Sequence, residues 1–180
     1  MKMSDEQLVK KCLEKDALAQ KQMFEFYSKR MMGVCLRYTR DSEEAQDVLQ
    51  LGFIKVFEKL DLYNNQGHLE GWIRKVIVNT ALDNIRRNKK FNDNVEMDKV
   101  EFQLPSGDVS GLESLKIQDL LKVIQSMPTG FRTVFNLFAI EGYSHKEIAE
   151  ELNISVSTSK SQYSRARVYL QKILIEEKVI

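Results

Sequence analysis

The side chains best suited to specific chemistry lie near the C-terminal end of the chain, and that chemistry is hydrogen bonding. Between residues 143 and 167, hydroxyl, amide and guanidinium groups recur at the i, i+3, i+4 and i+7 spacing of one helix face; they are Thr158, Ser161, Gln162 and Arg165. Such groups bond base edges or phosphates in the major groove of DNA. Lys160 and Arg167 flank this face as expected phosphate contacts.

Two short helices must position these groups. Ile148, Ala149 and Leu152 give the first helix an apolar stripe, and Asn153 and Ser155 are residues that end one helix and begin the next. The buried face of the second helix consists of Tyr163, Ala166 and Leu170. This is the pattern of a helix-turn-helix DNA reader. A pair of amphipathic helices with a solvated polar face fits the spacing equally well.

Ser159 interrupts the pattern, because it lies three residues after Val156 and four before Tyr163, on the side that should be buried. An aliphatic side chain would pack better there, since burying an unpaired hydroxyl costs free energy. We therefore expect Ser159→Val to raise the melting temperature of the C-terminal domain.

Composition places the chain among globular proteins. It has 180 residues, 43% of them hydrophobic, which suffices for one domain or two small ones with packed cores. The sequence has no apolar run of about 18 residues and a charged N-terminal stretch, so we expect a cytoplasmic protein with no stable membrane insertion.

Cysteine and histidine positions argue against a disulfide and against a metal site. Cys12 and Cys35 are far apart and outside any CxxC pattern, which favours two reduced, partly buried thiols. His68 and His145 are equally isolated. We therefore expect no metal and no other cofactor.

The formal net charge of +1 conceals an uneven distribution. Residues 1–90 hold 17 Lys and Arg against 13 Asp and Glu, residues 91–112 hold 1 against 5, and residues 113–180 hold 9 against 8. The middle segment has no helical period and contains one of the two prolines and two of the eight glycines. We predict an all-α protein with two small helical domains, residues 1–90 and 113–180, joined by an acidic flexible linker over 91–112.

A helix with an acidic first turn is predicted over residues 41–60. Its buried stripe consists of Ala45, Val48, Leu49, Phe53, Val56 and Leu60. A second face combines acid, amide and aliphatic groups, as expected of a surface that docks another protein's helix; it is formed by Asp47, Gln50, Leu51 and Ile54. The pattern fits equally well if a neighbouring helix of the same domain covers Leu51 and Ile54. An acidic helix start explains the carboxylates of Asp41, Glu43, Glu44 and Asp47 without acid–base chemistry.

A further helix is predicted over residues 71–90, after a loop at 62–70. Its buried stripe consists of Ile73, Val76, Ile77, Ala81 and Ile85, and another side presents Lys75, Asn79, Asp83 and Arg86. The helix begins with Trp72 and ends in a basic run of Arg86, Arg87, Lys89 and Lys90. This combination suits contact with a nucleic-acid strand whose bases are unstacked. Basic residues at a helix C-terminus also complement the helix dipole, which is the favoured explanation from the pattern alone.

Three motifs follow one another along the chain. They are DSEEAQDVLQLGFIKVFEKL at 41–60, GWIRKVIVNTALDNIRRNKK at 71–90, and MPTGFRTVFNLFAIEGYSHKEIAEELNIS at 127–155 followed by STSKSQYSRAR at 157–167. In this order and spacing the chain resembles the extracytoplasmic-function (ECF) group of bacterial sigma factors over nearly all of residues 5–172. It departs from the family at Ser159, where an aliphatic residue is usual, and at Gln162, where a basic one is usual.

The resemblance implies that the first domain is sigma region 2. The helix at 41–60 would then dock on the coiled coil of the β′ clamp of core RNA polymerase through Asp47, Gln50, Leu51 and Ile54. The next loop and helix would open the −10 promoter element and hold a flipped-out base of the non-template strand near Asn79. The residues implied for −10 recognition are Asn64, Asn65, His68, Trp72, Lys75, Asn79, Asp83, Arg86 and Arg87.

The second domain is similarly implied to be sigma region 4, which reads the −35 element in the major groove and contacts the β flap of the polymerase. The residues implied for −35 recognition are Ser157, Thr158, Lys160, Ser161, Gln162, Arg165 and Arg167. The acidic linker would thread toward the active-site and RNA-exit channels. Most attraction to promoter DNA would come from the polymerase, which is compatible with a near-neutral subunit. An anti-sigma factor is a further partner that the family implies.

Two other classes of function compete with this interpretation. A conventional transcriptional regulator would use the helix-turn-helix on duplex operator DNA and residues 1–90 for dimerisation or sensing. It leaves the Asp47 to Ile54 face unexplained and predicts tight duplex binding without polymerase. An α-helical enzyme is not supported, because the sequence has no nucleophile–base pairing, phosphate-binding glycine loop or metal-ligand spacing.

Overall fold

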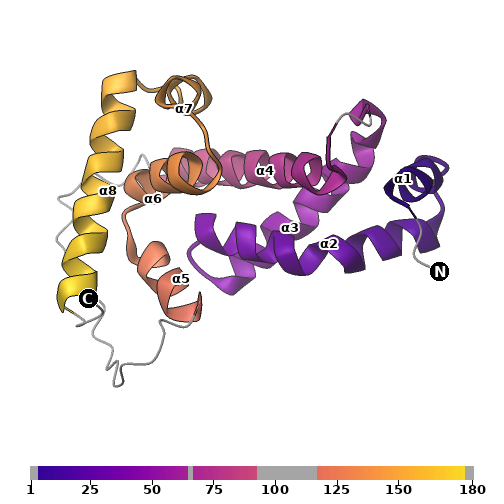
Figure 1. Cartoon of the computed structure of the whole chain (residues 1–180), viewed down its shortest axis with the longest axis horizontal. Helices are drawn as coiled ribbons and strands as arrows, with labels where there is room; N and C mark the ends of the chain where they lie inside the picture. Colours follow the sequence, from indigo (N-terminus) through magenta and orange to yellow (C-terminus); the bar gives the residue numbers. More distant parts are fainter. Residues whose placement is uncertain (1–3, 65–66, 93–116, 177–180) are drawn as a thin grey trace. The chain divides into compact units, whose positions relative to one another are not determined.

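The computed structural model describes residues 4–64, 67–92 and 117–176, and these residues form helices (Figure 1). The all-helical fold confirms the predicted class. The chain divides into two compact units, Met1–Glu96 and Met97–Ile180. The linker predicted over 91–112 lies outside the described residues, apart from residues 91 and 92, which belong to a helix. In the described part of the chain, no helix is both long and apolar enough to cross a membrane.

The first unit contains α1 (Asp5–Leu13), α2 (Ala17–Tyr38), α3 (Ser42–Glu58), a short 3-10 helix η1 (Leu60–Leu62) and α4 (Leu69–Asn92). Polar caps determine where the first three helices begin. Ser4 caps α1 in a capping box with Gln7, and Asp16 caps α2. At the start of α3 the carboxylate of Asp41 accepts a hydrogen bond from the Glu44 amide at 2.8 Å. The predicted helix start at Asp41 is therefore confirmed as a cap.

The core of the first unit lies where α2, α3 and α4 pack together. All six residues of the stripe predicted over residues 41–60 are buried, although α3 ends at Glu58 and Leu60 lies in η1. On α4 the predicted residues Ile73, Ile77 and Ala81 are buried, whereas Val76 and Ile85 are only half-buried. Helices α3 and α4 approach closely at Gly52, because a Cβ at that position would collide with the Cδ1 of Ile77.

Both cysteines belong to this core. Cys12 on α1 and Cys35 on α2 are free thiols, and both are fully buried, more so than the sequence indicated. Burial raises the pKa of Cys12 to about 11, with a further contribution from the Asp16 carboxylate. Burial likewise raises the pKa of Cys35 to about 12. Neither thiol is in the ionised form that reacts or binds metal near neutral pH.

The second unit contains α5 (Ile117–Ser126), α6 (Thr129–Phe135), a π-helical turn η2 (Asn136–Ile140), α7 (His145–Leu152) and α8 (Val156–Glu176). One hydrophobic cluster of this unit packs α5 and the residue after it against α8, and it consists of Val123, Ile124, Met127, Ala166, Tyr169 and Ile173. The hydroxyl of Tyr169 donates to the backbone oxygen of Ser126 at 2.9 Å, so the buried phenol keeps a hydrogen-bond partner.

A second contact region joins η2, α7 and α8. The ring of His145 stacks on Phe138 with centroids 4.3 Å apart, and Tyr163 lies against both rings. Ser159 is fully buried, as the pattern predicted, but its hydroxyl is not unpaired: its Oγ lies 2.9 Å from the Nδ1 of His145. The premise that Ser159 is an unsatisfied hydroxyl is therefore wrong.

Candidate functional site

The face of α3 that points away from the core is exposed to solvent. Asp47 and Gln50 are exposed, and the aliphatic side chains of Leu51 and Ile54 keep 39% and 53% of their surface accessible. The structure therefore does not support the alternative in which a neighbouring helix covers them. Because the opposite side of α3 is buried in the core, the helix is held rigidly and presents these four residues outward.

The loop between η1 and α4 is fixed by aromatic side chains. The hydroxyl of Tyr63 donates to the backbone oxygen of Gly67 at 2.9 Å, and the Tyr63 ring packs on Trp72 with centroids 5.7 Å apart. Gly67 has a φ of +90°, a conformation that glycine adopts without strain. Asn64 and His68 are exposed, and Asn65 lies outside the described residues. The sequence interpretation missed Tyr63, although an aromatic residue at each end of a glycine-containing loop was the available signal.

Helix α4 carries most of the remaining region-2 candidates on its surface. Lys75, Asn79, Arg86 and Arg87 are exposed, and Trp72 is half-buried at the start of the helix. The side chains of Lys89 and Lys90 lie outside those described. The described cations and the amide of Asn79 thus form a polar face that can meet a nucleic-acid strand.

Asp83 has a different environment from the other α4 candidates. Its Oδ2 lies 2.9 Å from the Nζ of Lys55 on α3, and its Oδ1 lies 2.9 Å from the Nη1 of Arg86. Partial burial raises the pKa of Asp83, but the hydrogen bonds and charges of Lys55 and Arg86 outweigh it and leave the pKa below its usual value. Asp83 therefore holds two cations in place and remains ionised.

These ion pairs lie in a surface hollow between α3 and α4. Its lining residues are Leu51, Lys55, Thr80, Asp83, Arg86 and Arg87. Leu51 belongs to the open face of α3, whereas Arg86 and Arg87 belong to the basic end of α4. The two predicted surfaces of the first unit therefore meet along one edge.

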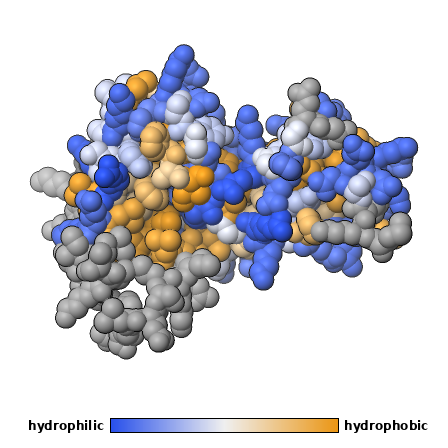
Figure 2. Space-filling model, viewed as in Figure 1, coloured by the Kyte–Doolittle hydropathy of each residue, from blue (hydrophilic) through white to orange (hydrophobic). Residues whose placement is uncertain are grey.

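The turn between α7 and α8 has the local chemistry that the sequence predicted. Asn153 ends α7 in the left-handed conformation, with a φ of 53°. The Oγ of Ser155 accepts a hydrogen bond from the Thr158 amide at 3.0 Å and caps the start of α8. Around α7 the visible surface is largely hydrophilic (Figure 2). The caps therefore fix a helix-turn-helix in which α8 is the second helix.

The exposed side of α8 differs in part from the predicted face. Ser157, Lys160, Ser161, Arg165 and Arg167 are exposed, whereas Thr158 is half-buried and its hydroxyl lies 2.8 Å from the Oγ of Ser155. Ser164 is exposed among them and was not predicted. It sits three residues after Ser161, so helical spacing alone could have identified it.

Gln162 does not belong to the exposed side. Its Oε1 is buried without a hydrogen-bond partner and lies 3.1 Å from the position that a Cβ on Gly130 would occupy. The amide therefore packs on α6. The periodicity argument placed Gln162 on the polar face because its side chain is polar, but the glycine in α6 leaves room for it to turn inward.

Comparison with known proteins decides the family. The model of sigma-70 region 2 matches residues 23–91, and the model of sigma-70 region 4 matches residues 117–170. The chain belongs to the ECF group of the sigma-70 family. Regions 2 and 4 coincide with the helices that carry the two sets of candidate residues.

Relatives of this sigma factor cover nearly its whole length. It is 28% identical over 180 residues to the RNA polymerase sigma-H factor of Pseudomonas aeruginosa, covering 94% of this chain and 93% of that protein. It is 26% identical over 175 residues to the ECF RNA polymerase sigma-E factor of Escherichia coli (strain K12), covering 92% and 91%. Its fold is similar to that of the sigma factor RpoE from Bartonella quintana, solved in complex with the anti-sigma factor NepR (TM-score 0.54, 22% identity, 86% and 95% coverage).

This sigma factor is a transcription initiation subunit of RNA polymerase and not an enzyme. Among the described residues, no three His, Cys, Asp or Glu side chains come together as metal ligands.

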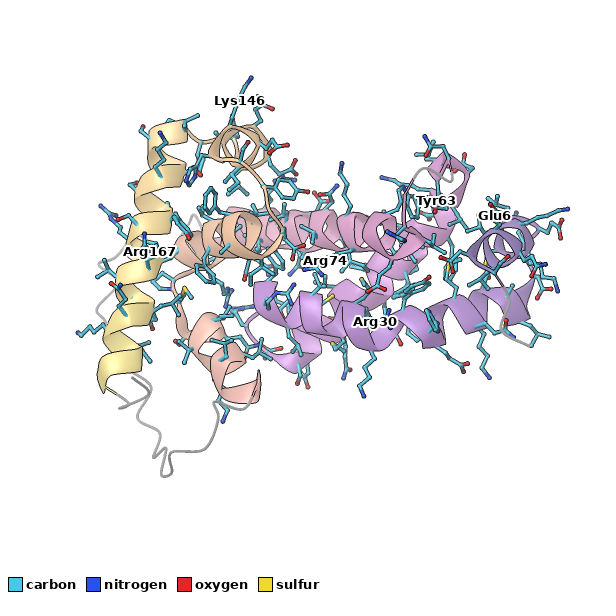
Figure 3. The ribbon with its side chains drawn as sticks, in the orientation of Figure 1. Glu6, Arg30, Tyr63, Arg74, Lys146 and Arg167 are labelled. Atoms are coloured by element: carbon cyan, nitrogen blue, oxygen red, sulfur yellow. The ribbon has the colours of Figure 1, made fainter. Side chains whose placement is uncertain are left out.

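Helix α7 carries an exposed cation, Lys146, that the sequence interpretation did not single out. Lys146 is exposed at the first turn of α7 and projects away from the helix, whereas Arg167 lies midway along α8 (Figure 3). The first helix of a helix-turn-helix crosses the DNA backbone when the second lies in the major groove. Lys146 lies on the first helix of this helix-turn-helix.

Proposed function

We propose that this sigma factor docks on core RNA polymerase through the α3 face of Asp47, Gln50, Leu51 and Ile54. The observation that supports this most is the exposure of Leu51 and Ile54 on a helix whose other side is fully packed. Exposed aliphatic groups beside an acid and an amide make anchors for a partner helix. The coiled coil of the β′ clamp is the partner surface, as the family implies.

The loop after η1 and the polar face of α4 then engage the −10 element. Lys75, Arg86 and Arg87 contact phosphates, and Asn79 with the loop contacts an unstacked base. Trp72 shapes the loop side of this surface through its contact with Tyr63. The remaining proposed members of the surface are Asn64, Asn65, His68 and Asp83, of which Asp83 acts through its ion pairs.

Helix α8 reads the −35 element in the duplex. Ser161, Ser164 and Arg165 face base edges, and Lys160 and Arg167 contact phosphates. Ser157 and Thr158 lie at the start of α8, where backbone amides also meet phosphates. Gln162 does not contact DNA in this proposal. Its amide packs on α6 and so helps to set the position of α8.

The proposed organisation follows from these roles. The region 2 domain comprises residues 1–90 together with the last two residues of α4. Residues 113–180 are the region 4 domain, which also contacts the β flap, and the rest of the predicted segment 91–112 is the linker. An anti-sigma factor is a proposed partner, since a sigma factor of similar fold was solved with one. A subunit of RNA polymerase works where the polymerase is, so we propose a cytoplasmic location.

Run-off transcription with core polymerase, with and without this protein, on a pooled promoter library tests the proposal. Start sites should appear only with the protein and should vanish with an Asp47→Arg/Leu51→Arg double variant. A Gln22→Arg/Glu25→Arg variant on α2 is the matched control, because it changes the net charge by the same amount at two exposed residues outside the α3 face.

The control variant should retain the start sites. Equal loss in both variants would show that the added positive charge, and not the docking face, causes the loss. Failure to bind core polymerase together with tight duplex binding by the protein alone would contradict the proposal and favour a conventional regulator.

A further inference from the structure

Glu44, in the first turn of α3, makes contacts that the docking and promoter-binding roles leave unexplained. Its side chain is only 16% exposed. Its Oε1 accepts hydrogen bonds from the Nδ2 groups of Asn84 and Asn88 on α4, both at 2.7 Å. Its Oε2 accepts the backbone N–H of Arg40 at 2.9 Å. One carboxylate therefore joins the start of α3 to two consecutive turns of α4.

The geometry of this cluster fixes the rotation of α4 about its own axis. An ionised carboxylate only accepts hydrogen bonds, so both asparagines must present their Nδ2 groups to Glu44. Asn84 and Asn88 are four residues apart and lie on the same face of the helix. Glu44 can accept both hydrogen bonds only when α4 is rotated so that the face of Asn84 and Asn88 is directed at α3.

Apolar packing anchors residues 83–88 of α4 less firmly than the residues before them. Leu82 is 1% exposed, whereas Ile85 is only half-buried and no side chain described from 83 to 88 is fully buried. A helical stretch with few buried apolar contacts moves more readily. Arg86 and Arg87 lie in this stretch, so their direction depends on polar contacts with α3.

Two polar clamps therefore hold the basic end of α4. One is the Lys55–Asp83 ion pair, whose side chains are 34% and 44% exposed, so solvent weakens it. The other is the Glu44 cluster, which is better shielded and has two short hydrogen bonds to a charged acceptor. Of the two, Glu44 is the stronger determinant of the direction of Arg86 and Arg87.

We propose that Glu44 is a positioning residue for promoter opening: by clamping Asn84 and Asn88 it directs Arg86 and Arg87 toward the phosphates of the −10 strand. The inference rests on the proposed function of α4. Glu44 itself contacts neither DNA nor polymerase in this role. Because Asp47 follows Glu44 by three residues on α3, the same helix that docks on the polymerase also sets the DNA-facing end of α4.

The test compares Glu44→Ala with Glu43→Ala in the full chain bound to core polymerase. Glu43 is exposed in the same turn, so the two changes remove the same charge from the same helix start. Promoter opening is followed with a fluorescent base at the −10 element, and core affinity and melting temperature are measured alongside. We expect Glu44→Ala to open promoters about tenfold more slowly than Glu43→Ala, the effect of losing hydrogen bonds to a charged group. Core affinity should remain within about twofold of the control.

The asparagines provide a second, independent variant. Asn84→Ala/Asn88→Ala should slow opening by a similar factor, and adding Glu44→Ala to it should cause no further loss, because all three residues act as one unit. Should Glu44→Ala fail to fold, Asn88→Ala alone carries the test, since Asn88 is only half-buried.

The outcomes separate this proposal from the function on which it rests. Arg87→Ala is measured in parallel. If Arg87→Ala opens promoters at the wild-type rate, the proposed role of α4 fails, and the positioning role fails with it. If Arg87→Ala is slow and Glu44→Ala is as fast as Glu43→Ala, the positioning role alone is overturned. A slow Glu44→Ala whose core affinity falls by the same factor also overturns it, because Glu44 would then act through docking.

Discussion

The Nδ1 atom of His145 lies 2.9 Å from the Oγ of Ser159, and this hydroxyl is fully buried within the helix-turn-helix. The same imidazole ring stacks on Phe138. With the hydroxyl fully buried and the imidazole half-buried, this pair stabilises most while both partners are present, because loss of either removes the hydrogen bond of the other.

The hydrogen bond reverses the effect expected of Ser159→Val from the sequence. Valine would fill the site but leave the ring nitrogen of His145 unpaired, so the variant should lower the stability of region 4 by about 1 kcal/mol. Thermal unfolding followed by circular dichroism measures this. The double variant His145→Phe/Ser159→Val removes both polar groups and should recover most of the loss. A single variant more stable than wild type would show that the hydrogen bond contributes nothing.

Gln162, three residues after Ser159 on α8, offers a stabilising change. Its Oε1 is buried without a hydrogen-bond partner, so Gln162→Met, which keeps the length of the side chain, should raise the stability of region 4 by about 1 kcal/mol. Selection of −35 sequences from a random pool should give the same preference as wild type. Arg165→Ala is the contrasting variant and should relax that preference. A changed preference in Gln162→Met would place Gln162 at the DNA after all.

The two substitutions show which kind of information the sequence carried. The buried stripe of α3 and the caps at Asp41 and Ser155 were predicted correctly, because helical periodicity and capping depend on neighbours in sequence. The partner of Ser159 and the inward turn of Gln162 depend on His145 and Gly130, which lie 14 and 32 residues away in sequence. A pattern within one helix contains no information about such partners.

The same reasoning applies to region 2. Lys75 and Asn79 were predicted on the exposed side of α4 and are exposed, since their surroundings are set by the helix alone. Asp83 was grouped with them by spacing, yet the structure pairs it with Lys55 from α3. The role of Tyr63 in fixing the loop could not be predicted from the sequence pattern either, because its hydroxyl donates to a backbone oxygen, that of Gly67.

The two thiols should be inert in the folded protein. Burial raises the pKa of Cys12 to about 11, with Asp16 adding to the effect, and burial raises that of Cys35 to about 12. Less than about 1% of either thiol is ionised at pH 8, and the thiolate is the reactive form. Labelling with a disulfide reagent at pH 8 should be slow in buffer and rapid in denaturant. Rapid labelling of the native protein would show that α1 or α2 opens locally.

The ion pair between Lys55 and Asp83 predicts a pH dependence of stability with a definite sign. Lys55 and Arg86 hold the pKa of Asp83 below its usual value despite partial burial, which acts to raise it. A carboxyl with a lower pKa in the folded state stabilises that state above its unfolded pKa of about 3.9, and the contribution disappears as the pH falls through the folded pKa. Both side chains are about a third or more exposed, so the contribution is below about 1 kcal/mol.

Urea unfolding of wild type and Asp83→Asn between pH 7 and pH 3 measures this contribution. Trp72 is the single tryptophan of the chain and lies on α4, so its fluorescence reports on region 2. Wild type should be more stable than Asp83→Asn at pH 7, and the difference should shrink below about pH 4. In a Lys55→Met background the difference at pH 7 should already be small, because the main partner is absent. Parallel pH profiles of wild type and Asp83→Asn would show that the pair is too solvated to matter, which would leave the Glu44 cluster as the clamp on the basic end of α4.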